Sequence, residues 1–199
     1  MIVTASCNAS RAKGLTLIEV LIGLVVIGVL AALVAPNFRE MIIRQRIRGV
    51  NAQLVTDLQF ARAEAATRNQ WARIRFRSDA TQTCYTIFTS TMNSKRCDCL
   101  LGAGSACTDA ATREVRTQSV PAGTGVSVGV PAGQATAFAF DHIAGGIVSI
   151  PTDDSSSALG SYTINVYADA SRSLRNVINQ SGRVTVCSPA GSTIQENPC

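Results

Sequence analysis

An unbroken apolar run near the start of the chain constrains its fold more than any other feature. No polar side chain interrupts residues 20–35, and three of the five residues before them are also apolar. As a helix, roughly 20 such residues measure about 30 Å, which matches the hydrocarbon thickness of a bilayer. The short segment before the run contains Arg11 and Lys13 and no acid. This charge bias predicts insertion with the N-terminus in the cytoplasm.

A secretory signal peptide and a retained membrane anchor both begin in this way. A signal peptide has a shorter apolar core and a small-residue cleavage site after it. Here the run is longer, it ends at Pro36-Asn37, and no A-x-A-like site closes it before the polar sequence begins. We therefore expect residues 15–36 to be kept as a single transmembrane helix.

Glu19 is the one acid within this apolar stretch. By insertion scales, a charged side chain near the bilayer centre costs about 2.5–3.5 kcal/mol. One interpretation places Glu19 near the interface, where it reaches headgroups or water. The other gives it a buried cationic partner close to the start of the span.

The segment Gly14-Leu15-Thr16-Leu17-Ile18-Glu19, followed by the apolar run and Pro36, resembles the type IV prepilin signature with its class III N-terminal methylation motif. The resemblance implies that residues 1–14 are a leader, cut after Gly14 by prepilin peptidase, and that Leu15 becomes the N-methylated first residue. It also implies that Glu19 pairs with the N-terminal amine of a neighbouring subunit and that Pro36 kinks the helix. Leu15 stands where phenylalanine is commoner in the family.

Loss of this leader would change the charge and the cysteine count. Cys7, Arg11 and Lys13 would be removed, which leaves six of the seven cysteines and lowers the formal charge from +5 to +3. The mature chain is then only mildly basic.

Beyond Pro36 the apolar residues become periodic, which predicts an amphipathic helix over residues 37–69. With the transmembrane part it would form one helix from Leu15 to Thr67, bent near Pro36 and Gly49, with Asn69 as its C-cap. The arginines of residues 39–48 either form a solvated or headgroup-facing surface or contact neighbouring subunits. The apolar face consists of Ile43, Ile47, Val50, Leu54, Leu58, Ala61 and Ala65.

The segment LVTDLQFARAEAATRN (residues 54–69) resembles a conserved stretch of the GspH/FimT family of minor pilins and pseudopilins, with Ala63 where serine is usual. We interpret it as structural, with Leu58 and Ala61 facing inward while Arg62 and Glu64 pair with neighbours. The matching residues are Asp57, Leu58, Phe60, Ala61, Arg62, Glu64, Ala65, Arg68 and Asn69.

Period-two patterns predict a β-rich head over residues 70–199. In Trp71–Phe76, Ala72, Ile74 and Phe76 share one face, and Trp71 with the two arginines shares the other. With the helix, these patterns predict an α+β fold in which a long N-terminal helix packs on an antiparallel sheet, and the resemblance to prepilins implies that this is the type IV pilin-like fold. The expected strands are Trp71–Phe76, Cys84–Thr89, Glu114–Val120, Val126–Val130, Thr136–Phe140, Ile147–Ile150, Tyr162–Tyr167, Leu174–Ile178 and Arg183–Cys187.

The head contains six cysteines, and no histidine lies near the Cys97-Asp98-Cys99 group. A metal site is the alternative there, but an oxidising compartment favours disulfides. We expect Cys187 to pair with Cys199. The other four, Cys84, Cys97, Cys99 and Cys107, would pair among themselves, with Cys84 joined to Cys97 or Cys99.

Catalytic motifs are absent from the sequence, so no enzyme activity and no cofactor are expected. His142 is the only histidine, and we interpret it as a structural hydrogen-bonding residue. The Asp153-Asp154 pair suits either calcium or plain solvation. Trp71 either stacks on a nucleobase or packs on the helix and on arginine stems.

Ser181-Gly182-Arg183 resembles the closing glycine-arginine strand of the same family, in which DNA-uptake pilins carry a second arginine two residues later. Thr185 occupies that position here. Arg172, Arg175 and Arg183 are candidate phosphate contacts if they cluster on neighbouring strands, in a sequence-independent and salt-sensitive mode. A solvated basic edge is the alternative that we favour.

These observations leave three functional hypotheses. The first is a FimT-like minor pilin that primes or joins a type IV pilus, and the second is the H-type minor pseudopilin of type II secretion. The third is a DNA-binding minor pilin for transformation. In each case the resemblance implies the same partners: major and minor pilin subunits, prepilin peptidase and an inner-membrane assembly platform. It places the protein in the bacterial inner membrane with a periplasmic head, and then in a pilus or pseudopilus.

Overall fold

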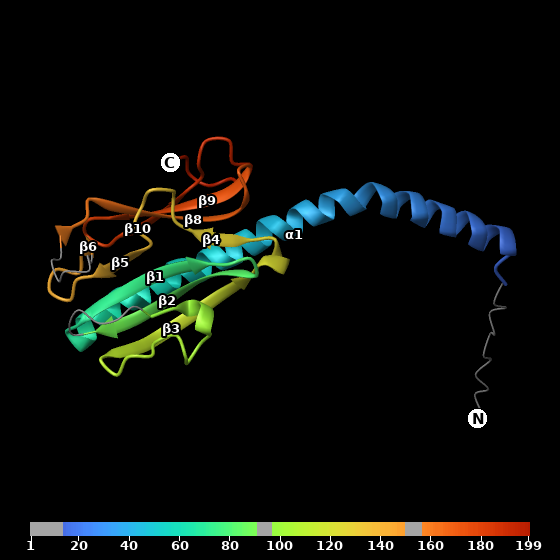
Figure 1. Cartoon of the computed structure of the whole chain (residues 1–199). Coiled ribbons are helices and arrows are strands. Elements are labelled where there is room, and N and C mark those ends of the chain that lie inside the picture. Colours follow the sequence, from blue (N-terminus) through green and yellow to red (C-terminus); the bar gives the residue numbers. More distant parts are fainter. Residues whose placement is uncertain (1–13, 91–96, 150–156) are drawn as a thin grey trace, which may run out of the picture. The chain divides into compact units, whose positions relative to one another are not determined.

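The computed structural model describes residues 14–90, 97–149 and 157–199, and these residues form one long α-helix, two short 3₁₀ helices and ten strands (Figure 1). The chain divides after Met41 into two compact units. The helix followed by antiparallel strands confirms the predicted α+β, pilin-like fold. The elements are α1 (Leu17–Arg68), β1 (Trp71–Ser78), β2 (Gln82–Ser90), η1 (Cys99–Leu101), β3 (Thr112–Pro121), η2 (Ala122–Thr124), β4 (Ser127–Gly129), β5 (Ala137–Phe140), β6 (Ile147–Ser149), β7 (Ser157–Ala158), β8 (Ser161–Asp169), β9 (Arg172–Asn179) and β10 (Val184–Cys187).

The first unit consists of the N-terminal part of α1. Thr16 caps it, since its Oγ1 accepts a hydrogen bond from the Glu19 N–H at 3.4 Å, which uses one of the free donors of the first turn. The large apolar side chains between Leu15 and Leu30 are all exposed, with 83 % of Leu17 accessible. Among the described residues, which leave out the side chains of 33–37, no helix is long and apolar enough to cross a membrane.

The assignment of α1 continues without a break through residues 36 and 49. The bends expected at Pro36 and Gly49 therefore stay predictions. The leader residues 1–13 and the Asp153-Asp154 pair lie outside the described residues.

The second unit contains the rest of α1, and here the predicted apolar face is buried. Ile47, Leu54, Leu58, Ala61 and Ala65 are at most 1 % exposed, while Ile43 and Val50 are partly buried against the same core.

The helix ends where the sequence indicates. Asn69 has φ 52°, and the Gln70 N–H donates to the Ala65 carbonyl at 3.2 Å, which is the bond of a Schellman C-cap. The side chain of asparagine tolerates this left-handed conformation better than most.

Two antiparallel sheets cover this part of the helix. The larger has the order β3-β2-β1-β5-β6-β7, and the smaller has the order β10-β9-β8-β4. In Figure 1, β1, β2 and β3 lie alongside the C-terminal part of α1, and β8, β9 and β10 form the second layer. Hairpins fix the register, with Ile74 opposite Ile87 in the first sheet and Ile164 opposite Asn176 in the second.

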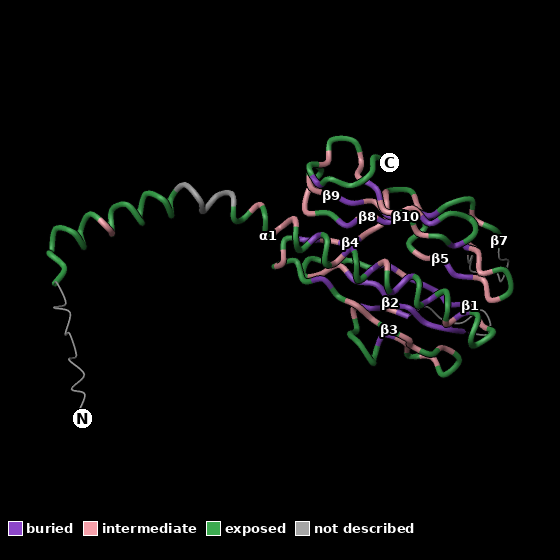
Figure 2. The backbone as a smooth tube through the Cα atoms, turned by 180° about the vertical axis from the view of Figure 1, so that it is seen from behind, coloured by how far each residue is buried: buried purple, intermediate pink, exposed green. Residues whose placement is uncertain are grey.

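The core lies between the helix and the two sheets. Figure 2 shows the buried residues concentrated on β1, β2, β8 and β9 and on part of α1. Phe138 and Phe140 meet edge to face with centroids 5.5 Å apart, and Phe138 also contacts Tyr162 at 4.3 Å. Such aromatic pairs add about 0.5–1.5 kcal/mol beyond the area they bury.

The short strand β7 of the first sheet was not predicted from the sequence. The arginine face of β1 is covered by the loop around η1. Arg73 is only 7 % exposed, and Arg75 donates to the Cys97 carbonyl at 3.2 Å.

Three disulfides join the cysteines of the head. Cys187 is bonded to Cys199, the pairing expected from the sequence. Cys84 is bonded to Cys99, one of its two expected partners, and Cys97 is bonded to Cys107.

Alkaline pH should unfold the head through its buried tyrosines. Desolvation raises the pKa of Tyr162 to about 12; burial, followed by its hydrogen bond to Asp57, raises the pKa of Tyr85. Their contribution to stability is present below the unfolded pKa of about 10 and falls as the pH rises above it, because the unfolded chain then releases these protons more readily.

A Tyr167→Phe variant leaves Tyr85 and Tyr162 as the only tyrosines. Its tyrosinate absorbance should rise together with the loss of near-ultraviolet circular dichroism. Tyrosinate that forms while the dichroism stays native would contradict the assigned burial.

Candidate functional site

The residues of the N-terminal motif lie together at the start of α1. Gly14, Leu15 and Glu19 are all exposed, and Glu19 is the acid of the first helical turn. An acid there interacts favourably with the helix dipole. The arrangement leaves both the bond after Gly14 and the Glu19 carboxylate open to other molecules.

A buried carboxylate joins α1 to the first sheet. The side chain of Asp57 has no exposed surface. It accepts hydrogen bonds from the Tyr85 hydroxyl of β2 at 2.7 Å and from Gln53 of α1 at 2.9 Å, and it forms an ion pair with Arg116 of β3. The sequence analysis identified Asp57 as part of a structural segment but not as this buried anchor.

Further side chains of α1 reinforce the attachment. The Arg116 guanidinium lies over the Phe60 ring, with its carbon 5.5 Å from the centroid, which is a cation–π geometry. At the second sheet, the Asn176 amide donates to Asn51 Oδ1 at 2.7 Å, and both residues are buried. The helix is therefore fixed to each sheet by a polar contact as well as by its apolar face.

Arg62 and two glycines form a close junction between the helix and both sheets. Arg62 Nε donates to the Gly145 carbonyl at 3.0 Å. A Cβ built on Gly182 would lie 2.4 Å from the Gly145 oxygen and 3.2 Å from Arg62 Nε. Only glycine fits there, because the approach is this close and φ is +79°.

This junction accounts for Arg62 and Gly182, and a separate ion pair on α1 accounts for Glu64 and Arg68, all of which carried the family resemblance. Arg62 bonds within its own chain, and Glu64 forms an ion pair with Arg68 one turn later. Gly182, from the glycine-arginine segment, lies against the turn that Arg62 holds. These residues act in the fold of the head.

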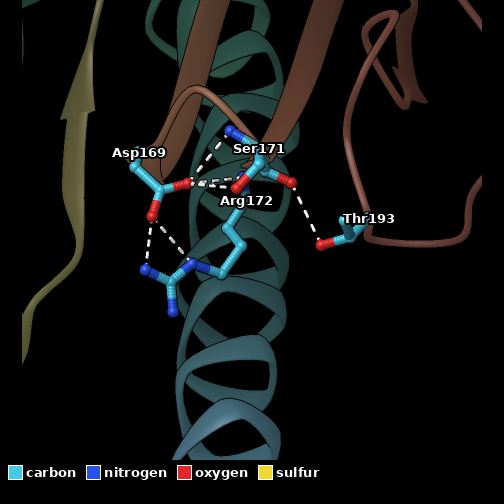
Figure 3. Close-up of polar contacts among 4 residues, drawn as sticks. All are labelled: Asp169, Ser171, Arg172 and Thr193. Carbon is cyan, nitrogen blue, oxygen red and sulfur yellow. Dashed lines mark hydrogen bonds and ion pairs between the residues drawn. The ribbon is translucent and has the colours of Figure 1, made fainter.

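The three arginines considered as DNA contacts do not form a cluster. Figure 3 shows the Arg172 guanidinium turned back onto Asp169 at the β8–β9 turn, where Nε donates to Oδ2 at 2.8 Å. The hydrogen bond from Arg172, followed by that from Ser171, lowers the pKa of Asp169 to about 2. The charge of Arg172 is therefore balanced by a carboxylate throughout the physiological pH range.

Arg175 and Arg183 lie elsewhere on the second sheet. Arg175 is opposite Cys187 in β10, while the Arg183 carbonyl is hydrogen-bonded to Asn179 at the far end of β9. Four residues of strand separate Arg175 from this end, about 13 Å, and seven residues separate Arg172 from it, about 23 Å. The three arginines are therefore spread along the second sheet, and the cluster on which a phosphate contact depended is not formed.

His142 and Trp71 belong to one aromatic contact. Their rings lie 6.4 Å apart, and the Arg73 guanidinium carbon lies 5.7 Å from the Trp71 centroid. His142 Nδ1 is 3.5 Å from the Asp141 carboxylate. Trp71 thus packs on an arginine and a histidine. Within the described ranges no group of three or more acids, cysteines or histidines is arranged to hold a metal ion.

The long helix, the antiparallel head and the prepilin-like start together define a pilin-like protein. The family model described as type II transport protein GspH matches residues 51–182, and that of the prokaryotic N-terminal methylation motif matches residues 9–35. The first match covers more than half of the chain, so the chain belongs to the GspH family. No curated protein and no solved structure matches it. The protein is a minor pilin or pseudopilin, a class of structural subunits.

Alanine substitutions at two glycines test the junction. Gly182 and Gly191 both have positive φ, +79° and +83°, but nothing lies within 4 Å of a Cβ at Gly191. Gly191→Ala should lower the free energy of unfolding by about 1 kcal/mol through backbone strain alone. Gly182→Ala should lower it by about 3 kcal/mol, because a clash adds to the strain. Equal losses in denaturant unfolding would show that the close approach to Gly145 does not matter.

Proposed function

We propose that the protein is a minor pilin of a type IV pilus, anchored in the bacterial inner membrane by residues 15–36 until it enters the filament. The observation that carries this proposal is the exposed apolar set between Leu15 and Leu30, which contains twelve large side chains. Burying each one is worth about 1.5–3 kcal/mol. First lipid and then the helices of sister subunits are the surroundings that supply this burial.

In this proposal prepilin peptidase cuts after Gly14 and methylates the new amine of Leu15. The match to the N-terminal methylation motif over residues 9–35 supports this step. Gly14 is exposed and precedes the first helical turn, which is consistent with this cut.

Glu19 then pairs with the N-terminal amine of a neighbouring subunit. A carboxylate and an ammonium that leave water together lose less free energy than either ion buried alone, provided that their contact is close. Glu19 therefore selects the axial position at which an incoming subunit docks. The head, placed on the periplasmic side, requires no catalytic group for this role.

The second candidate is a minor pseudopilin of a type II secretion system. The description of the matching family, type II transport protein GspH, favours it. The membrane part and the docking chemistry are the same for both candidates, and only the assembled machine differs. Deleting the gene should abolish piliation if the first candidate holds, or secretion of exported enzymes if the second does.

The third hypothesis, DNA binding, has no comparable support. Arg172 is neutralised by Asp169, and Arg175 lies within β9 while Arg183 lies beyond its far end. A gel-shift salt series with Arg183→Ala tests it. Salt-sensitive retardation that Arg183→Ala removes would restore the hypothesis.

Neutralising Glu19 tests the docking chemistry. Glu19→Gln keeps the shape of the side chain but not its charge, and should reduce incorporation into sheared filaments at least about tenfold, because the partner ammonium would be buried without a counter-ion. Immunoblots of filament and membrane fractions measure the ratio. Mass spectrometry should find Leu15 as the first residue in the variant as in the wild type.

Val20→Ala is the matched control, since it changes the next residue without changing charge, and it should assemble normally. Normal incorporation of Glu19→Gln would show that charge pairing does not drive docking. If Glu19→Gln kept its leader, Glu19 would be needed for cleavage by the peptidase instead of for docking, and this result would also contradict the proposal.

A further inference from the structure

The two disulfides of the loop that covers β1–β3 cross each other in sequence order. Cys84 of β2 is bonded to Cys99, and Cys97 is bonded to Cys107. The first of these four cysteines thus joins the third, and the second joins the fourth. The pairing is crossed if Cys84 bonds to Cys99 and uncrossed if it bonds to Cys97, and only one residue, Asp98, separates these two cysteines.

The unfolded chain does not favour the crossed pairing. The native bonds close loops with separations of 15 and 10 residues. In the uncrossed alternative, Cys84–Cys97 with Cys99–Cys107, each loop is two residues shorter. The entropy of loop closure changes slowly with length, so it hardly distinguishes the two pairings and slightly favours the uncrossed one. Contacts of the folded head must therefore select the native bonds.

Glu114 of β3 supplies the most concentrated of these contacts. Its carboxylate accepts hydrogen bonds from the backbone N–H groups of Gly104 at 2.8 Å and Ala106 at 3.1 Å. The Thr117 hydroxyl also donates to it at 2.7 Å. Hydrogen bonds to a charged acceptor are about twice as strong as neutral ones. Glu114 thereby holds the end of the loop that carries Cys107 against the edge of the sheet.

Contacts at Asp98 set the other end of the loop. The Asp98 N–H donates to the Ala106 carbonyl at 2.7 Å, which brings Cys97 next to Cys107. Its carboxylate is 3.4 Å from Arg77 of β1 and also accepts the Leu100 N–H at the start of η1. This first turn directs Cys99 towards β2, where Cys84 lies buried.

We propose that Cys97-Asp98-Cys99 is a thiol–disulfide exchange site at which an early Cys84–Cys97 bond is converted into the native Cys84–Cys99 bond, with Glu114 fixing the direction. The Cys99 thiolate attacks the sulfur of Cys84. A Cys84–Cys99 bond forms, the Cys84–Cys97 bond breaks, and Cys97 leaves as a thiolate, so no electrons are gained or lost. Cys97 and Cys107 then give two electrons and two protons to an external disulfide and form the second bond.

Oxidative refolding of the full chain tests the proposal. The protein carries Cys7→Ser, is reduced and denatured in detergent, and is then reoxidised with glutathione disulfide while samples are quenched by alkylation. Endoproteinase Asp-N cuts between Cys97 and Asp98. Crossed bonds leave the fragments of residues 79–97 and 98–108 joined, whereas uncrossed bonds leave them separate. Chymotryptic cleavage after Tyr85 or Phe88 and after Leu101 then places each of the four cysteines on its own fragment, which distinguishes the crossed pairing from the third possible pairing.

The wild-type chain should form the Cys84–Cys97 bond early, while Cys99 is still a free thiol, and then convert it to the crossed form. Glu114→Gln, which keeps the shape but not the charge, should leave an uncrossed fraction at least about fivefold larger at the end of the reaction. Arg113→Gln is the matched control on the exposed neighbouring residue, and it should behave as the wild type. Identical final fractions for Glu114→Gln and Arg113→Gln would overturn the role of Glu114.

A Cys107→Ser variant isolates the exchange step and does not depend on how well Glu114→Gln folds. Trapped with a single Cys84–Cys97 bond and transferred to neutral pH without glutathione or oxygen, it should convert to Cys84–Cys99 at a rate independent of protein concentration. Absence of this conversion, or a wild-type reaction in which Cys84–Cys97 never forms, would contradict the exchange site.

Discussion

The fold of the head depends on the Asp57 carboxylate, which has no exposed surface and lies where the helix meets the first sheet. Taking a charge out of water costs several kcal/mol, and only a full set of partners offsets it. Tyr85, Gln53 and Arg116 provide that set from β2, α1 and β3. If α1 slid by one turn, about 5.4 Å, Asp57 would lose Tyr85 and Arg116 and keep only Gln53, which moves with the same helix. The contact therefore fixes the register of α1 in addition to its attachment.

This register divides the helix by function. From Ile43 onward one apolar face of α1 belongs to the core of the head, and the Arg62–Gly145–Gly182 junction closes the same unit. The large apolar side chains between Leu15 and Leu30 remain exposed. The protein thus pairs a self-contained head with an apolar helical segment that needs other surroundings, which is the physical basis of the proposed role as a filament subunit.

Periodicity predicted the C-terminal half of the helix and all the longer strands, because their apolar residues repeat with the period of the element that buries them, while a continuous apolar run predicted the N-terminal half. The partners of Asp57 could not be predicted, since Tyr85 and Arg116 lie 28 and 59 residues away. The sequence also could not decide between the crossed pairing, Cys84–Cys99 with Cys97–Cys107, and the uncrossed one, because their loop lengths are nearly equal. The ion pair of Arg172, by contrast, spans only three residues, and the Asp-x-x-Arg spacing across a tight turn was a usable signal against a DNA contact.

A double-mutant cycle between Asp57 and Tyr85 tests the central claim most directly. The free energy of unfolding is measured in denaturant for Asp57→Ala, Tyr85→Phe and the double variant. Because the Tyr85 hydroxyl and the Asp57 carboxylate are both buried, neither can form a hydrogen bond to water in place of the other. The account therefore predicts a coupling energy of at least about 1.5 kcal/mol between them. Additivity within about 0.5 kcal/mol would show that the two groups act independently and that the buried carboxylate does not hold the helix to the sheet.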